Sequence, residues 1–353
     1  MNTVNILLTA CGGHYMIDVI QCYRDIGGII TKVIGVASEP DPTIFPFVDC
    51  YYKVSPCSMR EKYLMELADI CRKEKIDIIV PTMDEELILL RDNVDIFNQT
   101  GTRISVSEGP HLAEAVNKEA FLCRISAAGI PHPRYEMFDS VAGLHDCVRK
   151  LGYPRNPVCI KAVDKAGSRG FRIIDPNKSL FKMMLEDKPT SRYISLDAFS
   201  SMYAPYAGSQ NRMMVQEYLP GDEYSVDLVA DHGNVLYIGG RRNLVVDNSI
   251  PLVSVTEKNA EAYEISKAIV KEFCLDGNAN IDFIFNGDGF PIPTEINPRI
   301  SASIGLYNKA GMNLAGLQIM RMLGKYLPDC KMTEWVEVRR TYTPTFKYPN
   351  QES

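Results

Sequence analysis

The strongest local signal in the sequence lies in residues 280–299, NIDFIFNGDGFPIPTEINPR. Its two apolar runs flank the polar, glycine-containing segment NGDG at residues 286–289, and this pattern predicts a β-hairpin. Residues two apart in a strand share a face, so the side chains of Glu295 and Asn297 point the same way. An acidic and an amide side chain therefore gather on one face of the hairpin.

Asp282 lies in the other strand and interrupts an apolar run, where an unpaired charge would be costly. A hairpin centred on NGDG puts Asp282 opposite Pro293 and diagonal to Glu295, within about 7–8 Å between backbone positions. Two carboxylates and the Asn297 amide oxygen would then converge, and oxygen-only ligands suit Mg²⁺ bridged to substrate phosphates. The alternative is a solvated sheet face with incidental acids. Arg299 follows directly, as in a site where a cation and a metal together handle phosphate charge.

Composition sets the outer limits. The chain has 353 residues, with 38 Lys and Arg against 44 Asp and Glu, so its formal net charge is −6. Hydrophobic residues at 46% and charged residues at 23% are typical of a globular protein and argue against disorder. The length requires two or three domains. An acidic chain lacks the basic surface of a duplex-binding protein, so we expect no nucleic-acid partner.

The ends and the cysteines indicate the compartment. The N-terminal MNTVNILLTACGG has no basic region and no long apolar core, and no stretch of about 18 uncharged apolar residues occurs. We therefore expect no secretory signal and no membrane partner. The ten cysteines form no C-x-x-C and no zinc-like spacing with histidine. They indicate reduced thiols in a cytoplasmic protein.

The pattern along the chain predicts an α/β protein. Apolar strands at residues 4–10, 32–38 and 77–82 alternate with helical patterns such as 59–75, which indicates a parallel sheet covered on both faces. A helix is expected from 111 to about 129, where Gly-Ile-Pro ends it. Beyond it we expect a hairpin around residues 165–170, an irregular, mobile insertion or lid edge at 186–212, and strands from 213 to 246.

Lys161 lies inside the apolar strand VCIKAV and precedes the loop DKAGSRG, residues 164–170. A lysine there either extends outward to solvent or pairs with an anion. Glycines let backbone N–H groups approach a phosphate. Taken alone the loop matches neither a Walker A motif nor G-x-G-x-x-G, and an ordinary hairpin turn is the alternative.

Taken in order, these pieces resemble the ATP-grasp superfamily. The pieces are a helix lysine at Lys118, Lys161 with AGSRG, QEYLPGDEYSVD, IDFIF and TEINPR. VPTMDEEL and NPRISAS are similar to stand-alone relatives of the carbamoyl phosphate synthetase large subunit. The resemblance covers nearly the whole chain and implies an ATP-grasp fold behind a Rossmann-like pre-ATP-grasp domain. The implied domains are 1–110, a small lid subdomain with its leading helix at 111–215, and a large subdomain carrying the metal site at 216–353.

The resemblance also assigns roles to residues. It implies nucleotide contacts at Lys118, Lys161, Lys165, Gly167, Ser168, Arg169, Gly170, Glu217, Tyr218, Leu219 and Glu223. Among these, Lys118 and Lys161 are expected to contact the phosphates, and the loop 165–170 is expected to cover them. Residues 217–219 are expected to bind the adenine and Glu223 the ribose. It implies Mg²⁺ ligands at Asp282, Glu295 and Asn297, with Mn²⁺ as an alternative ion. Arg299 and one of Arg241 and Arg242 are the implied catalytic cations.

The substrate candidates lie where strands end. Asp84 and Glu85 begin a helix after a strand, where they either bind an ammonium group or only compensate the helix dipole. Gly13 and His14 follow the first strand, in a substrate contact or simply a tight turn. Ser301 and Ser303, in NPRISAS, complete the set. Ala162 and Lys165 depart from the family pattern, which usually has proline and glycine there.

The resemblance implies an ATP-dependent carboxylate–amine ligase that joins small substrates such as amino acids through an acyl phosphate. Two alternatives stay open: an enzyme that releases an acyl phosphate, and a nucleotide-binding protein without turnover. A dinucleotide-dependent oxidoreductase is disfavoured, because no G-x-G-x-x-G follows the first strand. The expected partners are a small carboxylate and an amine, and relatives commonly form homodimers.

Overall fold

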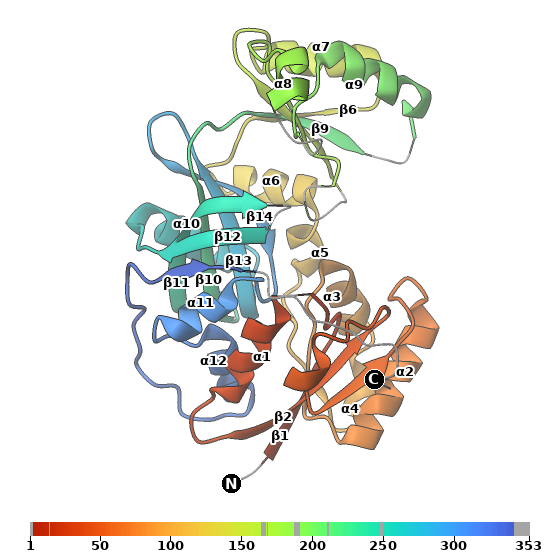
Figure 1. The fold of residues 1–353 in the computed structure, drawn as a ribbon, viewed down its shortest axis with the longest axis vertical. Coiled ribbons are helices and arrows are strands. Elements are labelled where there is room, and N and C mark those ends of the chain that lie inside the picture. Colours follow the sequence, from red (N-terminus) through yellow and green to blue (C-terminus); the bar gives the residue numbers. More distant parts are fainter. Residues whose placement is uncertain are drawn as a thin grey trace.

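The computed structural model describes residues 3–13, 15–163, 167, 169–186, 191–209, 212–247 and 250–341 (Figure 1). Within these residues the strands form sheets of five, six and four strands. No helix in this part of the chain combines the length and the apolar character needed to span a bilayer.

The N-terminal domain is built on a parallel sheet, as the sequence predicts, and its strand order is β3-β2-β1-β4-β5. Its strands are β1 (Thr3–Leu8), β2 (Ile30–Ala37), β3 (Cys50–Lys53), β4 (Ile78–Val80) and β5 (Arg103–Ile104). Its helices are α1 (Met16–Arg24), α2 (Arg60–Glu74), α3 (Asp84–Arg91) and α4 (Val94–Asn98), with a short 3₁₀ turn at Phe45–Phe47. The strands are apolar on both faces because helices cover the sheet on both sides.

The lid is an antiparallel sheet in the order β6-β9-β7-β8, at the top of Figure 1. Its strands are β6 (Tyr135–Phe138), β7 (Val158–Ala162), β8 (Arg172–Ile174) and β9 (Met213–Glu217). Its helices are α7 (Val141–Lys150), α8 (Leu180–Glu186) and α9 (Leu196–Tyr203), followed by a 3₁₀ turn at Ala204–Tyr206. The pairing of β7 with β8 confirms the predicted hairpin.

The segment 186–212 contains more regular structure than its composition suggests. Ser195 caps α9, with its hydroxyl accepting from the Ala198 N–H at 3.1 Å. Phe199 and Tyr203 are buried and pack with Phe138 of β6. The expectation of an irregular stretch is therefore wrong for α9, whose aromatic residues form part of the lid core.

The helix predicted at 111–129 is interrupted. It consists of α5 (Leu112–Ala115) and α6 (Lys118–Ala127). Asn117 separates them, because its backbone is extended and its side chain accepts from the Ala120 N–H at 3.0 Å. This capping arrangement makes Lys118 the first residue of α6.

The large sheet is antiparallel, in the order β14-β13-β10-β11-β12-β15. Its strands are β10 (Glu223–Asp231), β11 (Asn234–Asp247), β12 (Ile250–Thr256), β13 (Gly277–Phe285), β14 (Pro291–Asn297) and β15 (Glu337–Arg339). One face packs on α6 and α10 (Ala260–Glu272) through a continuous apolar core. The other face carries Ser225, Asp282 and Glu295.

The N-terminal domain and the large sheet share one core. α11 (Ile304–Lys309) and α12 (Leu314–Met322) lie between β14 and β15 in the chain and pack against α1. Ile304 and Leu314 lie in the same buried cluster as Met16 and Val19. Burial of these apolar side chains fixes the first domain against the loop that follows β14.

Gly240 of β11 offers a test of this packing. A Cβ atom there would lie 1.8 Å from the Tyr224 hydroxyl and 2.7 Å from the Glu257 carbonyl oxygen. We therefore expect Gly240→Ala to lower the free energy of unfolding by about 1–3 kcal/mol, because buried Tyr224 must move. Gly287→Ala is the matched control, since its Cβ would meet nothing within 4 Å. Urea denaturation measures both, and equal midpoints would contradict the packing described.

Candidate functional site

Two carboxylates stand directly opposite each other on the polar face of the large sheet. Asp282 of β13 pairs with Glu295 of β14, while the next residue, Phe283, pairs with Pro293. The register shift leaves Thr294 as an extra residue, and its hydroxyl donates to the Asp282 carbonyl at 3.1 Å. The predicted pairing of Asp282 with Pro293 is therefore wrong, because this β-bulge shifts the register and places Glu295 opposite Asp282. The bulge brings the two acids closer than the sequence alone indicates.

The two acids titrate differently. Burial, then the Glu295 carboxylate, raises the pKa of Asp282 to about 7. Burial acts the same way on Glu295, but the charges of Lys118 and Lys161 outweigh it and hold the pKa of Glu295 below its usual value. The Lys118 ammonium lies 3.5 Å from Glu295 Oε2. Burial lowers the pKa of Lys161, and the Glu295 charge opposes that shift. A cation bound beside Asp282 would stabilise its ionised form.

A line of polar side chains fixes Asp282. Ser225 Oγ donates to Asp282 Oδ1 at 2.7 Å, and Asn243 Nδ2 donates to Ser225 Oγ at 3.0 Å. Ser254 Oγ in turn donates to Asn243 Oδ1 at 2.9 Å. On the other side, Asn297 Nδ2 donates to Asp282 Oδ2 at 3.2 Å. The carboxylate is therefore held from β10, β11, β12 and β14 together.

These residues fit a hard divalent cation. Asp282, Glu295 and Asn297 supply two carboxylates and an amide, an all-oxygen donor set of the kind Mg²⁺ prefers. A second acidic group, Asp231 with Asp276, does not need a metal ion. Arg321 Nη1 lies 2.5 Å from Asp231 Oδ1 and 3.0 Å from Asp276 Oδ1, so a guanidinium neutralises it.

Arg299 lies beside the carboxylates and is bound by the N-terminal domain. Its Nε and Nη2 donate to Asp84 at 2.8 and 3.2 Å, and its Nη2 also donates to Asn297 Oδ1 at 3.3 Å. Glu85, the neighbour of Asp84, instead accepts from the Cys57 thiol at 3.8 Å. Of the two acids that begin α3, the structure brings Asp84 to the site.

The loop after Arg299 contains two buried serines. Ser301 and Ser303 are 5% and 1% exposed, and within the described part of the chain their hydroxyl oxygens have no hydrogen-bond partner. Buried hydroxyls normally find a partner. Ser301 and Ser303 lie two and four residues after Arg299 in the same loop.

Arg241 and Arg242 point to opposite faces of β11. Arg241 pairs across the sheet with Ser225, contacts Asp227 and donates to the Tyr307 hydroxyl at 3.2 Å, so it lies on the carboxylate face. Arg242 lies on the α10 face. There it donates to Glu257 at 2.7 Å through two nitrogens and to Asp222 at 2.9 Å. Arg242 is not brought into the site, because it points to the opposite face of the sheet.

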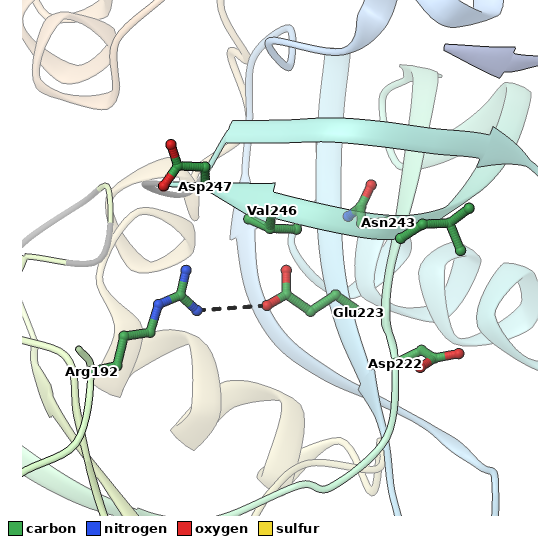
Figure 2. Close-up of a pocket in the computed structure, with 7 residues that line it drawn as sticks. Arg192, Asp222, Glu223, Asn243, Val246 and Asp247 are labelled. Atoms are coloured by element: carbon green, nitrogen blue, oxygen red, sulfur yellow. Dashed lines mark ion pairs between the residues drawn. The ribbon is translucent and has the colours of Figure 1, made fainter. Parts of the chain in front are cut away.

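A pocket of about 410 Å³ lies next to the patch (Figure 2). It is lined by Arg192, Asp222, Glu223, Asn243, Leu244, Val246 and Asp247. In Figure 2 Arg192, from the lid segment before α9, points toward Glu223, and their charged atoms lie 3.9 Å apart. Burial raises the pKa of Glu223, against the Arg192 charge. Of these seven residues the sequence analysis identified only Glu223. Arg192 carries no local motif.

The connection from the lid to the large sheet, at the end of β9, is held by hydrogen bonds from Arg134. Arg134 Nε and backbone N donate to the Glu217 carboxylate at 2.8 and 2.9 Å. The Glu217 backbone N–H in turn donates to the Arg134 carbonyl at 2.9 Å, so side-chain and main-chain bonds together fix the end of β9. Leu219 is buried at this junction.

The glycine-containing loop is described only in part. Gly170 has φ +75°, and a Cβ there would lie 2.6 Å from the Ala162 Cβ, so the position requires glycine. Gly167 and Arg169 are exposed. Lys165, Ser168 and His14 lie outside the described residues. Gly13 has φ +84° and donates its N–H to Asp41 at 3.2 Å, so it forms the turn after β1.

Comparison with known families gives two matches. Residues 209–343 match the family described as "ATP-grasp in the biosynthetic pathway with Ter operon", and residues 6–105 match the family "PylC-like, N-terminal domain". The carbamoyl phosphate synthase large chain of Clostridium perfringens is 25% identical over 350 residues, which cover 92% of this chain and 29% of that protein. The chain thus spans less than a third of that relative's length.

Solved structures share the fold. Biotin carboxylase from Campylobacter jejuni superposes with a TM-score of 0.67 at 17% identity, covering 93% of this chain and 73% of that one. L-amino acid ligase from Bacillus licheniformis gives 0.62 at 15% identity, covering 91% and 74%. At these identities the likeness shows the fold alone. It confirms the predicted ATP-grasp architecture behind a parallel-sheet N-terminal domain.

The raised pKa of Asp282 predicts a pH-dependent stability in the metal-free protein. Its carboxyl ionises near pH 4 in the unfolded chain but near pH 7 when folded, so ionisation costs stability as the pH rises through this window. We expect Asp282→Asn to stabilise the metal-free protein by about 1–3 kcal/mol at pH 8 and by little at pH 4. Denaturant titrations at the two pH values, with chelator, measure this.

Asp288→Asn is the control, because Asp288 lies in the exposed turn of the same hairpin. It should change stability little at either pH. An equal effect of Asp282→Asn at pH 4 and pH 8 would show that the two opposed carboxylates do not compete for a proton.

Proposed function

Because the chain is an ATP-grasp protein with a PylC-like N-terminal domain, we propose that it is an ATP-dependent carboxylate–amine ligase. It acts on small substrates such as amino acids. The observation that carries the proposal is the pair Asp282 and Glu295, set directly opposite each other. Lys118, Lys161 and Arg299 surround that pair with positive charge. Such a patch suits a metal-bound polyphosphate.

In this proposal the nucleotide lies between the lid and the large sheet. The backbone of residues 217–219 binds the adenine, and Glu223 binds the ribose in the pocket that Arg192 closes. Lys118 and Lys161 neutralise phosphate oxygens. The loop residues Lys165, Gly167, Ser168, Arg169 and Gly170 cover the phosphates and exclude water.

Asp282, Glu295 and Asn297 would hold Mg²⁺, which would offset the negative charge of the phosphates. The protein itself positions the substrates and neutralises the charge of the phosphoryl group in transfer. Arg299 neutralises the phosphoryl group in transfer. Arg241, fixed by Asp227 and Tyr307, contributes positive potential to the same face of the sheet.

The chemistry has two steps. An oxygen of the substrate carboxylate attacks the γ-phosphorus, the bond to the ADP oxygen breaks, and an acyl phosphate forms. The amine then attacks the acyl carbon, phosphate leaves, and the amine gives up a proton as the amide forms. Exclusion of water protects the acyl phosphate between the steps.

The substrates are proposed to bind where the N-terminal domain meets the loop after β14. The hydroxyls of Ser301 and Ser303 have no partner among the described residues, and Gly13 and Glu85 follow β1 and β4. We propose His14, the next residue after Gly13 in the sequence, as a further substrate contact. The carboxyl edge of a parallel sheet is the usual place for ligand contacts in open α/β folds. The name of one structural neighbour, an L-amino acid ligase, agrees with amino acids as a substrate class.

The first test is a substrate screen. We expect ADP and phosphate release to require both a carboxylate and an amine, because the amine step regenerates the free enzyme. Pairs from a panel of amino acids and small acids, assayed for ADP, measure this. Glu295→Ala should lower turnover at least about 100-fold, since removing charge stabilisation of this size costs about 3 kcal/mol. If no pair in the panel gives ADP above background and Glu295→Ala releases as much ADP as wild type, the ligase proposal is wrong.

The second test is for the acyl phosphate. With ATP, the carboxylate and hydroxylamine in place of the amine, we expect a hydroxamate to form in amounts equal to ADP. Colorimetric iron detection measures it. Accumulation of free acyl phosphate without any amine would instead identify an enzyme whose product is the acyl phosphate itself. ADP without hydroxamate would contradict the intermediate.

A further inference from the structure

The N-terminal domain reaches the carboxylate patch through one forked ion pair. Arg299 Nε donates to Asp84 Oδ1 at 2.8 Å and Arg299 Nη2 donates to Asp84 Oδ2 at 3.2 Å. Each side chain is 20% exposed. Asp84 is the first residue of α3, so a residue 215 positions away in sequence sets the plane of this guanidinium. Paired bonds of this kind fix orientation as well as proximity.

The main chain near Arg299 is already fixed by other contacts. Arg340 donates to the Ala302 carbonyl at 2.7 Å and to Asp18 of α1 at 2.9 Å. Ile300 and Ile304 lie in the core shared with α1. These contacts hold the loop, and the direction of the Arg299 side chain is left to its own partners.

Those partners form a continuous chain to Asp282. Besides Asp84, the described contacts of Arg299 are the Ile300 carbonyl at 3.1 Å and Asn297 Oδ1 at 3.3 Å. Asn297 donates onward to Asp282 Oδ2 at 3.2 Å. The Ile300 and Asn297 contacts come from the same loop and strand as Arg299. Among the side-chain hydrogen bonds of the described residues, the pair to Asp84 ties the guanidinium to a different domain. The Arg299 charge also acts on Tyr15 of that domain.

We propose that Asp84 is a positioning residue that acts through Arg299, holding the guanidinium where the terminal phosphate of the nucleotide binds. This rests on the proposed nucleotide site. Both Asp84 oxygens accept from Arg299, so the carboxylate serves this ion pair rather than an ammonium group of the substrate. The first domain therefore takes part in phosphate binding without touching the nucleotide.

The test compares the affinities of ADP and the non-hydrolysable analogue AMPPNP, both with Mg²⁺, by calorimetry. In wild type we expect AMPPNP to bind about tenfold more tightly, because Arg299 contacts its terminal phosphate. Asp84→Asn presents an amide donor to Arg299 Nη2 and turns the guanidinium away. It should remove most of that tenfold preference while leaving the ADP affinity within about twofold.

The double variant distinguishes a positioning effect of Asp84 on Arg299 from a general disturbance of the nucleotide site. Arg299→Ala should lose the preference too, and Asp84→Asn with Arg299→Ala should lose no more than Arg299→Ala alone. Asp92→Asn is the matched control, at the exposed far end of the same helix. If Asp84→Asn does not fold, Asp84→Ser carries the same expectation.

An unchanged preference in the Asp84 variant would overturn the inference, as would an additive loss in the double variant or an increased preference. A wild type without any preference for AMPPNP would overturn it as well. Failure of the substrate screen would reject the ligase and leave these binding measurements valid, so the two failures are distinguishable.

Discussion

The site depends on one electrostatic constraint: two carboxylates, Asp282 and Glu295, face each other across neighbouring strands. Like charges directly opposite in a sheet destabilise it. The protein meets this constraint by keeping a proton on Asp282 up to about pH 7 and by placing two lysines near Glu295. A bound cation would remove the remaining conflict. The arrangement costs folding stability, which is expected at a functional site.

The cations around this pair come from separate parts of the fold. Lys118 begins α6 because Asn117 caps that helix, and Lys161 comes from β7 of the lid. Arg299 comes from the loop after β14, and its direction is set by the N-terminal domain. A chain with a net charge of −6 thus concentrates positive charge at one place. Side chains from the lid sheet, α6 and the loop after β14 thus supply charge to the carboxylate pair, and the N-terminal domain contributes through Asp84.

Much of this could be predicted from the sequence, because strand alternation and residue order are local signals. The parallel N-terminal sheet, the β7–β8 hairpin and the gathering of Asp282, Glu295 and Asn297 all follow from such patterns. The exact pairing of Asp282 did not, because the bulge at Thr294 depends on contacts that no local pattern records. The break at Asn117 was visible as a capping residue before Lys118 but lies within an otherwise helical pattern. Arg192 and the Asp84–Arg299 pair depend on tertiary contacts across the chain.

A crystal structure of the protein with ADP and Mn²⁺, in which anomalous scattering locates the ion, would test the proposed metal and nucleotide sites together. We predict the anomalous peak between the Asp282 and Glu295 carboxylates, with the ribose at Glu223 and the adenine against residues 217–219. A nucleotide bound elsewhere, or an ion at Asp231 and Asp276 with none between Asp282 and Glu295, would contradict it.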